Sequence, residues 1–151
     1  VLNTSDNRAM STAQWNSIVE TLQGKTKTTA LKIPLIYGFD AIHGATYVSG
    51  ATFFPQAIGQ AASWNRQMVK DAATITAYES RAASVSWNFS PVLDLGVNPL
   101  WPRIWETYGE DPYLVAEMGK QVIDGYQNPL GNKNHVAACL KHFLAYYFQK
   151  T

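Results

Sequence analysis

The chain has little charge, one cysteine and no long apolar run. Charged residues make up 15% of the 151 residues and the net charge is +1. Phosphate binding needs a dense basic face, so no nucleic acid partner is expected. The apolar runs fall short of the roughly 18 residues that suggest a membrane span, so no membrane partner is expected either. The single cysteine, Cys139, excludes an intrachain disulfide framework and a cysteine-based zinc site.

Targeting signals are equally scarce. The first residues lack a basic region followed by an apolar one, so no signal peptide is visible. Two sequons, Asn3-Thr4-Ser5 and Asn88-Phe89-Ser90, would carry glycans in a secreted protein.

Aromatic residues, by contrast, are abundant. They make up 13% of the chain, with five Trp and eight Tyr. The hydrophobic fraction of 46% is ordinary for a globular protein, and this length lies within the range of one domain. A surface with few charges and many rings favours the binding of a carbohydrate or another small molecule.

Helical and extended patterns alternate along the chain. Helical spacing follows a capping box at Ser11 and Gln14, a cap at Ser63 or Asn65, and a cap at Asp111. Between the helices lie apolar runs without alternation, which are typical of strands covered on both faces. The predicted helices cover 11–24, 63–84 and 111–125, and the predicted strands cover 33–39, 85–95 and 135–142. This alternation predicts an α/β fold with parallel strands.

The helix patterns also predict ends and buried faces. Gly24 and Gly125 stand where the first and third helices are expected to end. The apolar face expected to be buried on the second helix consists of Met68, Val69, Ala72, Ile75, Ala77 and Tyr78.

Polar side chains follow the predicted strands where each strand ends. Asp40 and His43 follow the first strand, Asp94 lies at the end of the second, and Lys141 and His142 close the third. The carboxyl ends of parallel strands form the edge where α/β folds bind ligands. We therefore expect these groups to lie close together despite their separation in sequence.

Three segments carry a specific motif pattern. They are residues 33–44 (IPLIYGFDAIHG), residues 101–112 with Trp101-Pro102-Arg103 and YGEDP, and Lys141-His142-Phe143. FPQ at 54–56 and WNFSPVLD at 87–94 lie between them. In this order and spacing the chain resembles glycoside hydrolase family 3, most closely its β-glucosidases and exo-β-glucanases, over nearly its whole length.

The resemblance implies a fold and an activity. The fold would be a (β/α)8 TIM-like barrel, of which residues 1–151 form a single partial domain, roughly the first half. The activity would be release of terminal non-reducing β-D-glucosyl residues from a β-glucoside or β-glucan oligosaccharide, by a retaining mechanism without a cofactor. An extracellular or secretory location is expected.

The resemblance also implies which side chains hold the terminal sugar. Asp40 would accept hydrogen bonds from its outer hydroxyls, and Arg103, Lys141 and His142 would bind further hydroxyls. His43, Asp94 and Trp101 are expected to support this set, with Trp101 also a candidate platform for the sugar ring. Adjacent residues of a regular strand point to opposite faces, so an irregular backbone is expected at Lys141 and His142.

The catalytic carboxylates do not match. A retaining glycosidase needs two carboxyl groups about 5–5.5 Å apart. The resemblance puts the nucleophile, an Asp on a later strand, beyond Thr151, and the acid/base in a second domain. No catalytic residue is therefore assigned, the 151 residues alone are expected to be inactive, and the rest of a longer chain would be needed to complete the barrel.

Two other functions fit the same residues. Asp40, His43, Asp94 and His142 could bind a divalent metal in a barrel hydrolase, although Lys141 beside a ligand histidine would repel a cation. The chain could also be a non-catalytic sugar-binding fragment.

Overall fold

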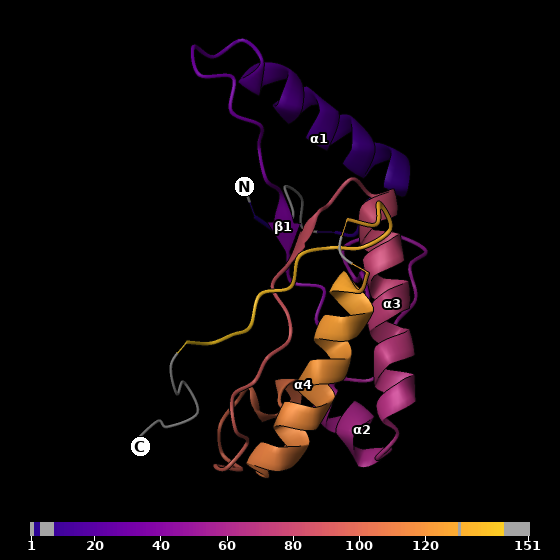
Figure 1. Ribbon diagram of the computed structural model, residues 1–151, viewed down its shortest axis with the longest axis vertical. Coiled ribbons are helices and arrows are strands. Elements are labelled where there is room, and N and C mark those ends of the chain that lie inside the picture. Colours follow the sequence, from indigo (N-terminus) through magenta and orange to yellow (C-terminus); the bar gives the residue numbers. More distant parts are fainter. Residues whose placement is uncertain (1, 4–7, 130, 144–151) are drawn as a thin grey trace.

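The computed structural model describes residues 2–3, 8–129 and 131–143 of the chain (Figure 1). The long helices α3 (Arg66–Ala82) and α4 (Pro112–Gln127) lie side by side along one flank of a short parallel sheet, and α1 (Thr12–Thr26) lies beyond one end of that sheet (Figure 1). In chain order the elements are α1 (Thr12–Thr26), β1 (Gly38–Phe39), α2 (Ala57–Ala62), α3 (Arg66–Ala82), β2 (Trp87–Asn88), the 3-10 turn η1 (Ile104–Glu106) and α4 (Pro112–Gln127).

The sheet is parallel, as the alternating pattern predicts. Gly38 of β1 pairs with Trp87 of β2. The third predicted strand lies on the other side of β2, where parallel bridges join Trp87 to Ala137 and Val92 to Lys141. The α/β class with parallel strands is confirmed.

The strands are much shorter than the apolar runs. Ile33 and Ile36 are 65% and 62% exposed, so the run at 33–39 is not covered on both faces, and only its last two residues form a strand. Pro91 interrupts the second run because it has no backbone N–H to donate to a ladder. Beyond it the pairing continues only as a bridge at Val92.

The first helix begins as predicted and ends later. The Ser11 hydroxyl accepts a hydrogen bond from the Gln14 backbone N–H, and the Gln14 side chain accepts one from the Ser11 N–H, which completes the capping box. Trp15 is fully buried and its Nε1 donates to the Tyr47 carbonyl at 2.8 Å. Gly24 does not end the helix, which continues to Thr26.

Helices α3 and α4 pack along each other. Asn65, not Ser63, caps α3 by accepting from the Met68 backbone N–H, and Asp111 caps α4 with Pro112 in its first turn. Gly125 does not end α4: a Cβ there would lie 2.6 Å from the Lys70 carbonyl oxygen. The residue is therefore a point of close approach to α3.

The buried face of α3 agrees only in part with the predicted one. Met68, Ile75 and Tyr78 are 59%, 42% and 59% exposed. Val69 and Ala77 are buried, as predicted, and the other buried residues of this helix are small: Ala73, Thr76 and Ser80. The short distance between the two helices leaves room only for small side chains, so the largest apolar residues of α3 point outward.

The structure bears on membrane insertion and on glycosylation of the chain. Within the described residues no helix combines the length and apolar character that crossing a membrane requires. Asn88, the glycan acceptor of the second sequon, is fully buried. A glycan on that side chain is incompatible with this fold.

Candidate active site

An ion pair joins two of the predicted site residues across 101 positions of sequence. The Nζ of Lys141 lies 2.5 Å from Oδ1 of Asp40, and the two side chains are 13% and 31% exposed. Asp40 follows β1, and Lys141 lies in the segment that runs beside β2. Parallel pairing therefore brings the two residues to one edge of the sheet, as the sequence predicts.

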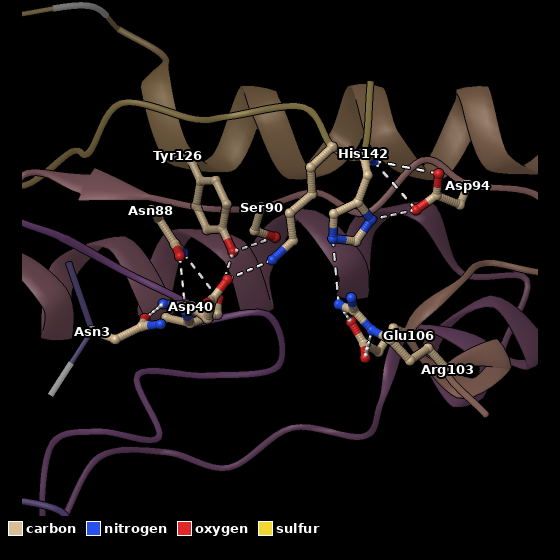
Figure 2. A network of polar contacts seen from close by, with 11 residues as sticks. Asn3, Asp40, Asn88, Ser90, Asp94, Arg103, Glu106, Tyr126 and His142 are labelled. Atoms are coloured by element: carbon tan, nitrogen blue, oxygen red, sulfur yellow. Dashed lines mark hydrogen bonds and ion pairs between the residues drawn. The ribbon is translucent and has the colours of Figure 1, made fainter. Parts of the chain in front are cut away.

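The backbone around Asp40 is held from both sides (Figure 2). The Asp40 N–H donates to Oδ1 of Asn3 at 3.0 Å. The next residue, Ala41, donates its N–H to Oδ1 of Asn88 and accepts from Nδ2 of Asn88, both at 2.9 Å. The Tyr126 hydroxyl donates to the same Ala41 carbonyl at 3.1 Å. Three segments distant in sequence thus fix the position of one carboxylate.

Tyr126 brings α4 into this network. Its ring is buried, and its hydroxyl lies 3.3 Å from Oγ of Ser90. Burial raises the pKa of Tyr126 to about 12, although its contacts with Ser90 and Asn88 act in the opposite direction. The hydroxyl therefore stays protonated at neutral pH and acts as a donor.

A second pair joins His142 to Asp94. The His142 Nδ1 lies 2.6 Å from Oδ2 of Asp94, and the His142 backbone N–H donates to the same carboxylate at 3.2 and 3.3 Å. The Asp94 side chain is only 2% exposed. A carboxylate so buried needs such donors to replace water. Asp94 therefore holds both the ring and the backbone N–H of His142.

Arg103 reaches the same imidazole from the opposite side. Its Nη2 lies 3.3 Å from Nε2 of His142. Its Nε and Nη2 each donate at 2.6 Å to one carboxylate oxygen of Glu106, one turn later in η1. Figure 2 shows the row that results, with His142 between Asp94 and Arg103, and Glu106 beyond the arginine.

The backbone at the junction of the two clusters is irregular, as predicted. The peptide bond between Lys141 and His142 is cis. The adjacent side chains both reach partners in the site, since Lys141 contacts Asp40 while His142 contacts Asp94.

The remaining two predicted residues lie differently. The His43 Nδ1 contacts the Phe54 carbonyl oxygen at 2.9 Å and its ring meets Phe53 edge-on, so this histidine ties two loop segments together. Trp101 is 3% exposed. A buried ring offers no face to a sugar, so the structure contradicts the platform role of Trp101.

Four positioning residues were not assigned to the site from the sequence. Asn3 holds the Asp40 N–H, Asn88 and Tyr126 hold the turn after Asp40, and Glu106 holds Arg103. Only Glu106 carried a local signal, because it lies three residues after Arg103 in a helical turn, where opposite charges meet. Asn88 lies inside a sequon and Tyr126 inside a helix face, and neither pattern points to Asp40.

The metal-binding alternative finds no support in the geometry. Among the described residues, no three His, Cys, Asp or Glu side chains are grouped so that they could hold a metal ion. Asp40 is paired with Lys141, and Asp94 and His142 are paired with each other.

Curated relatives of known activity match most of the chain. The lysosomal β-glucosidase of Dictyostelium discoideum is 40% identical over 87% of this chain and 17% of its own length. A β-xylosidase of Formosa agariphila is 37% identical over 85% of the chain and 19% of its own length. The periplasmic β-glucosidase of Salmonella typhimurium is 33% identical over 77% of the chain and 15% of its own length.

Solved structures match the fold. A β-glucosidase from Listeria innocua superposes with a TM-score of 0.82 and 38% identity, over 97% of this chain and 19% of its own. A β-glucosidase from Erythrobacter marinus gives a TM-score of 0.88 with 30% identity, over 97% of this chain and 20% of its own. These similarities confirm the predicted fold class, part of a barrel domain with parallel strands.

The chain therefore corresponds to one region of much longer proteins. It spans less than a fifth of the length of the curated relatives named above. The model of the glycosyl hydrolase family 3 N terminal domain matches residues 1–149. On this match, the chain belongs to glycosyl hydrolase family 3.

Proposed function

We propose that these residues form the sugar-holding part of a β-glucosidase active site. Asp40, Arg103, Lys141 and His142 bind the hydroxyls of the terminal non-reducing β-D-glucosyl residue of a β-glucoside or β-glucan oligosaccharide. Residues 1–151 act as one partial domain, roughly the first half of the barrel. The whole protein cleaves the glycosidic bond by a retaining mechanism.

The observation that carries this proposal is the gathering of four charged or titratable side chains at one sheet edge. Asp40 and Lys141 are 2.5 Å apart, and Arg103 and His142 are 3.3 Å apart. A sugar ring offers several hydroxyls, each both donor and acceptor, and charged partners make stronger hydrogen bonds with them than neutral partners do. The site mixes acceptors with donors, which suits a polyhydroxylated ligand.

The ligands of relatives support the choice of substrate. The Listeria innocua β-glucosidase has been solved in complex with glucose, and a variant of it in complex with laminaribiose. An exo-1,3/1,4-β-glucanase from a Pseudoalteromonas species shares the fold with a TM-score of 0.85. Relatives named β-xylosidases make xylose the competing terminal sugar.

We assign the two catalytic carboxylates to parts of the protein outside these residues. Asp40 and Asp94 are occupied by Lys141 and His142, and neither is assigned as nucleophile or acid. The proposal also includes a location outside the cytosol, which the lysosomal and periplasmic relatives support.

Hydrolysis of a chromogenic aryl β-glucoside tests the proposal. In a full-length protein that contains these residues, Asp40→Ala is expected to reduce turnover by at least 100-fold, on the order of the loss of about 3 kcal/mol of charged hydrogen bonding. Asp71→Ala is the matched control, because Asp71 lies on α3, outside the site network. Near-normal turnover by the Asp40 variant would contradict the proposal, as would turnover by the 151 residues alone.

A further inference from the structure

The row Asp94–His142–Arg103–Glu106 assigns a protonation state to its histidine. An ionised carboxylate only accepts hydrogen bonds, so the His142 Nδ1, 2.6 Å from Asp94, carries a proton. A guanidinium only donates, so the His142 Nε2, 3.3 Å from Arg103, accepts and carries no proton. Both contacts are satisfied together only by the neutral ring with its proton on Nδ1.

Glu106 holds Arg103 in the orientation from which it donates to the His142 Nε2. Its two oxygens receive Nε and Nη2 of Arg103 in parallel at 2.6 Å, a bidentate geometry that fixes the plane of the guanidinium. The Glu106 side chain is 11% exposed, whereas that of Arg103 is 34% exposed. The shielded carboxylate therefore orients a more exposed cation toward the imidazole.

We propose that Glu106 is a positioning residue that, through Arg103, keeps His142 as the neutral Nδ1–H tautomer with an acceptor at Nε2. The inference deepens the proposed function, on which its meaning for sugar binding rests. A sugar hydroxyl that takes the place of Arg103 at the His142 Nε2 would then donate to its lone pair and accept from the N–H of Arg103 released there. A ring protonated on Nε2 would offer a second donor instead, and the pairing with a single hydroxyl would be lost.

Among the residues that the structure describes, the charged groups that face His142 come from three segments. Asp94 follows β2, Arg103 and Glu106 belong to the turn at η1, and Lys141 precedes the ring in sequence. Lys141 is directed to Asp40 rather than to the imidazole. Of the described contacts at the ring nitrogens, one is thus with an acceptor, Asp94, and one with a donor, Arg103.

Nitrogen-15 NMR of the histidine rings in the chain without sugar tests the proposal. The chain has three histidines, so a His142→Gln variant assigns the signals of interest. At neutral pH the ring of His142 is expected to show a bound proton at Nδ1 and a pyridine-type nitrogen at Nε2. A proton on Nε2 in the unmodified chain would overturn the proposal.

The role of Glu106 is tested by Glu106→Gln, which keeps the shape and removes the charge. Arg103 is then no longer held against the ring, and the Nε2 signal is expected to move toward the protonated type. Glu110→Gln removes the same charge from an exposed neighbour and is expected to leave the signal in place. An unchanged Nε2 signal in a folded Glu106 variant would refute the positioning role.

A second variant keeps the test decisive if Glu106→Gln fails to fold. Arg103→Gln removes the donor itself and is expected to give the same change at Nε2, whereas an unchanged signal would overturn the proposal. The measurement needs neither turnover nor a bound sugar. Its outcome is therefore independent of the hydrolysis assay that tests the proposed function.

Discussion

At the scale of single residues, the turn after Asp40 is held in place by several hydrogen bonds from side chains. The amide of Asn88 pairs with both backbone groups of Ala41, and the Tyr126 hydroxyl adds a second donor to the same carbonyl. Each such bond contributes roughly 0.5–1.5 kcal/mol. The cost of partly removing the Asp40 carboxylate from water is thus offset by hydrogen bonds to the backbone that follows it.

Tyr126 makes this network sensitive to alkali. Burial raises its pKa to about 12 from the ordinary value of 10.0. The stability contributed by the neutral phenol is therefore fully present below pH 10 and is lost as the pH rises toward 12.

We expect Tyr126→Phe to remove this pH dependence. Between pH 10 and 11 the free energy of unfolding should fall less steeply in the variant, by up to about 1.4 kcal/mol per pH unit. Urea unfolding at several pH values measures the slope. Tyr113→Phe, at a tyrosine 70% exposed, should leave the slope unchanged. Identical slopes for the Tyr126 variant and the unmodified chain would contradict the prediction.

The composition of the site was predictable, whereas its pairing was not. Asp40, Asp94, Lys141 and His142 follow apolar runs, and parallel strands end at one edge, so their proximity follows from local patterns. The pairing of carboxylates with cations depends on the register of the strands. That register is set by contacts between residues far apart in the sequence. Asn88 was missed because its environment, fully buried beneath the turn, does not show in its neighbours along the chain.

At the scale of elements, the sequence predicts the bounds of the helices more accurately than the bounds of the strands. Caps act through bonds between residues two or three positions apart, so Ser11, Asn65 and Asp111 were predictable from local sequence. A strand exists only where a partner pairs with it. The apolar runs at 33–39 and 85–95 therefore gave the positions of β1 and β2 and overstated their lengths.

Two glycines in helices are expected to respond oppositely to the same substitution. Gly125→Ala should destabilise the chain by about 1–3 kcal/mol, because the new Cβ would lie 2.6 Å from the Lys70 carbonyl oxygen and 2.7 Å from Cβ of Ala73. Gly24→Ala meets no atom within 4 Å and should stabilise by about 0.5–1 kcal/mol through helix propensity.

Urea unfolding of the two variants measures both effects on one scale. Because the chemical change is identical, the unfolded states are affected alike and the difference reports the packing of α3 against α4. Stabilisation by both substitutions would mean that the helices do not approach each other as closely as described.

At the scale of the molecule, large apolar side chains lie open to solvent beside the short sheet. Ile33, Leu140 and Phe143 are 65%, 55% and 95% exposed, and the strands β1 and β2 are only two residues long. Exposed apolar surface and unpaired edges favour association. In the proposed complete barrel, further strands would cover these residues.

The 151 residues on their own are therefore expected to self-associate. Sedimentation velocity should show an average mass that rises with concentration. Leu140→Glu should lower the association, because it places a charge at the open edge. Leu100→Glu, at a residue 80% exposed in the loop between β2 and η1, serves as control. A monodisperse monomer at all concentrations would contradict the expectation.

The central claim is that this chain supplies the side chains that hold the terminal sugar, and binding of glucose to the 151 residues tests it most directly. Saturation-transfer NMR should show magnetisation passing from the chain to glucose, with the effect lost in Asp40→Ala and retained in Asp71→Ala. Equal transfer in the Asp40 variant and in the unmodified chain would contradict the assignment of Asp40 to the sugar, and with it the proposed site.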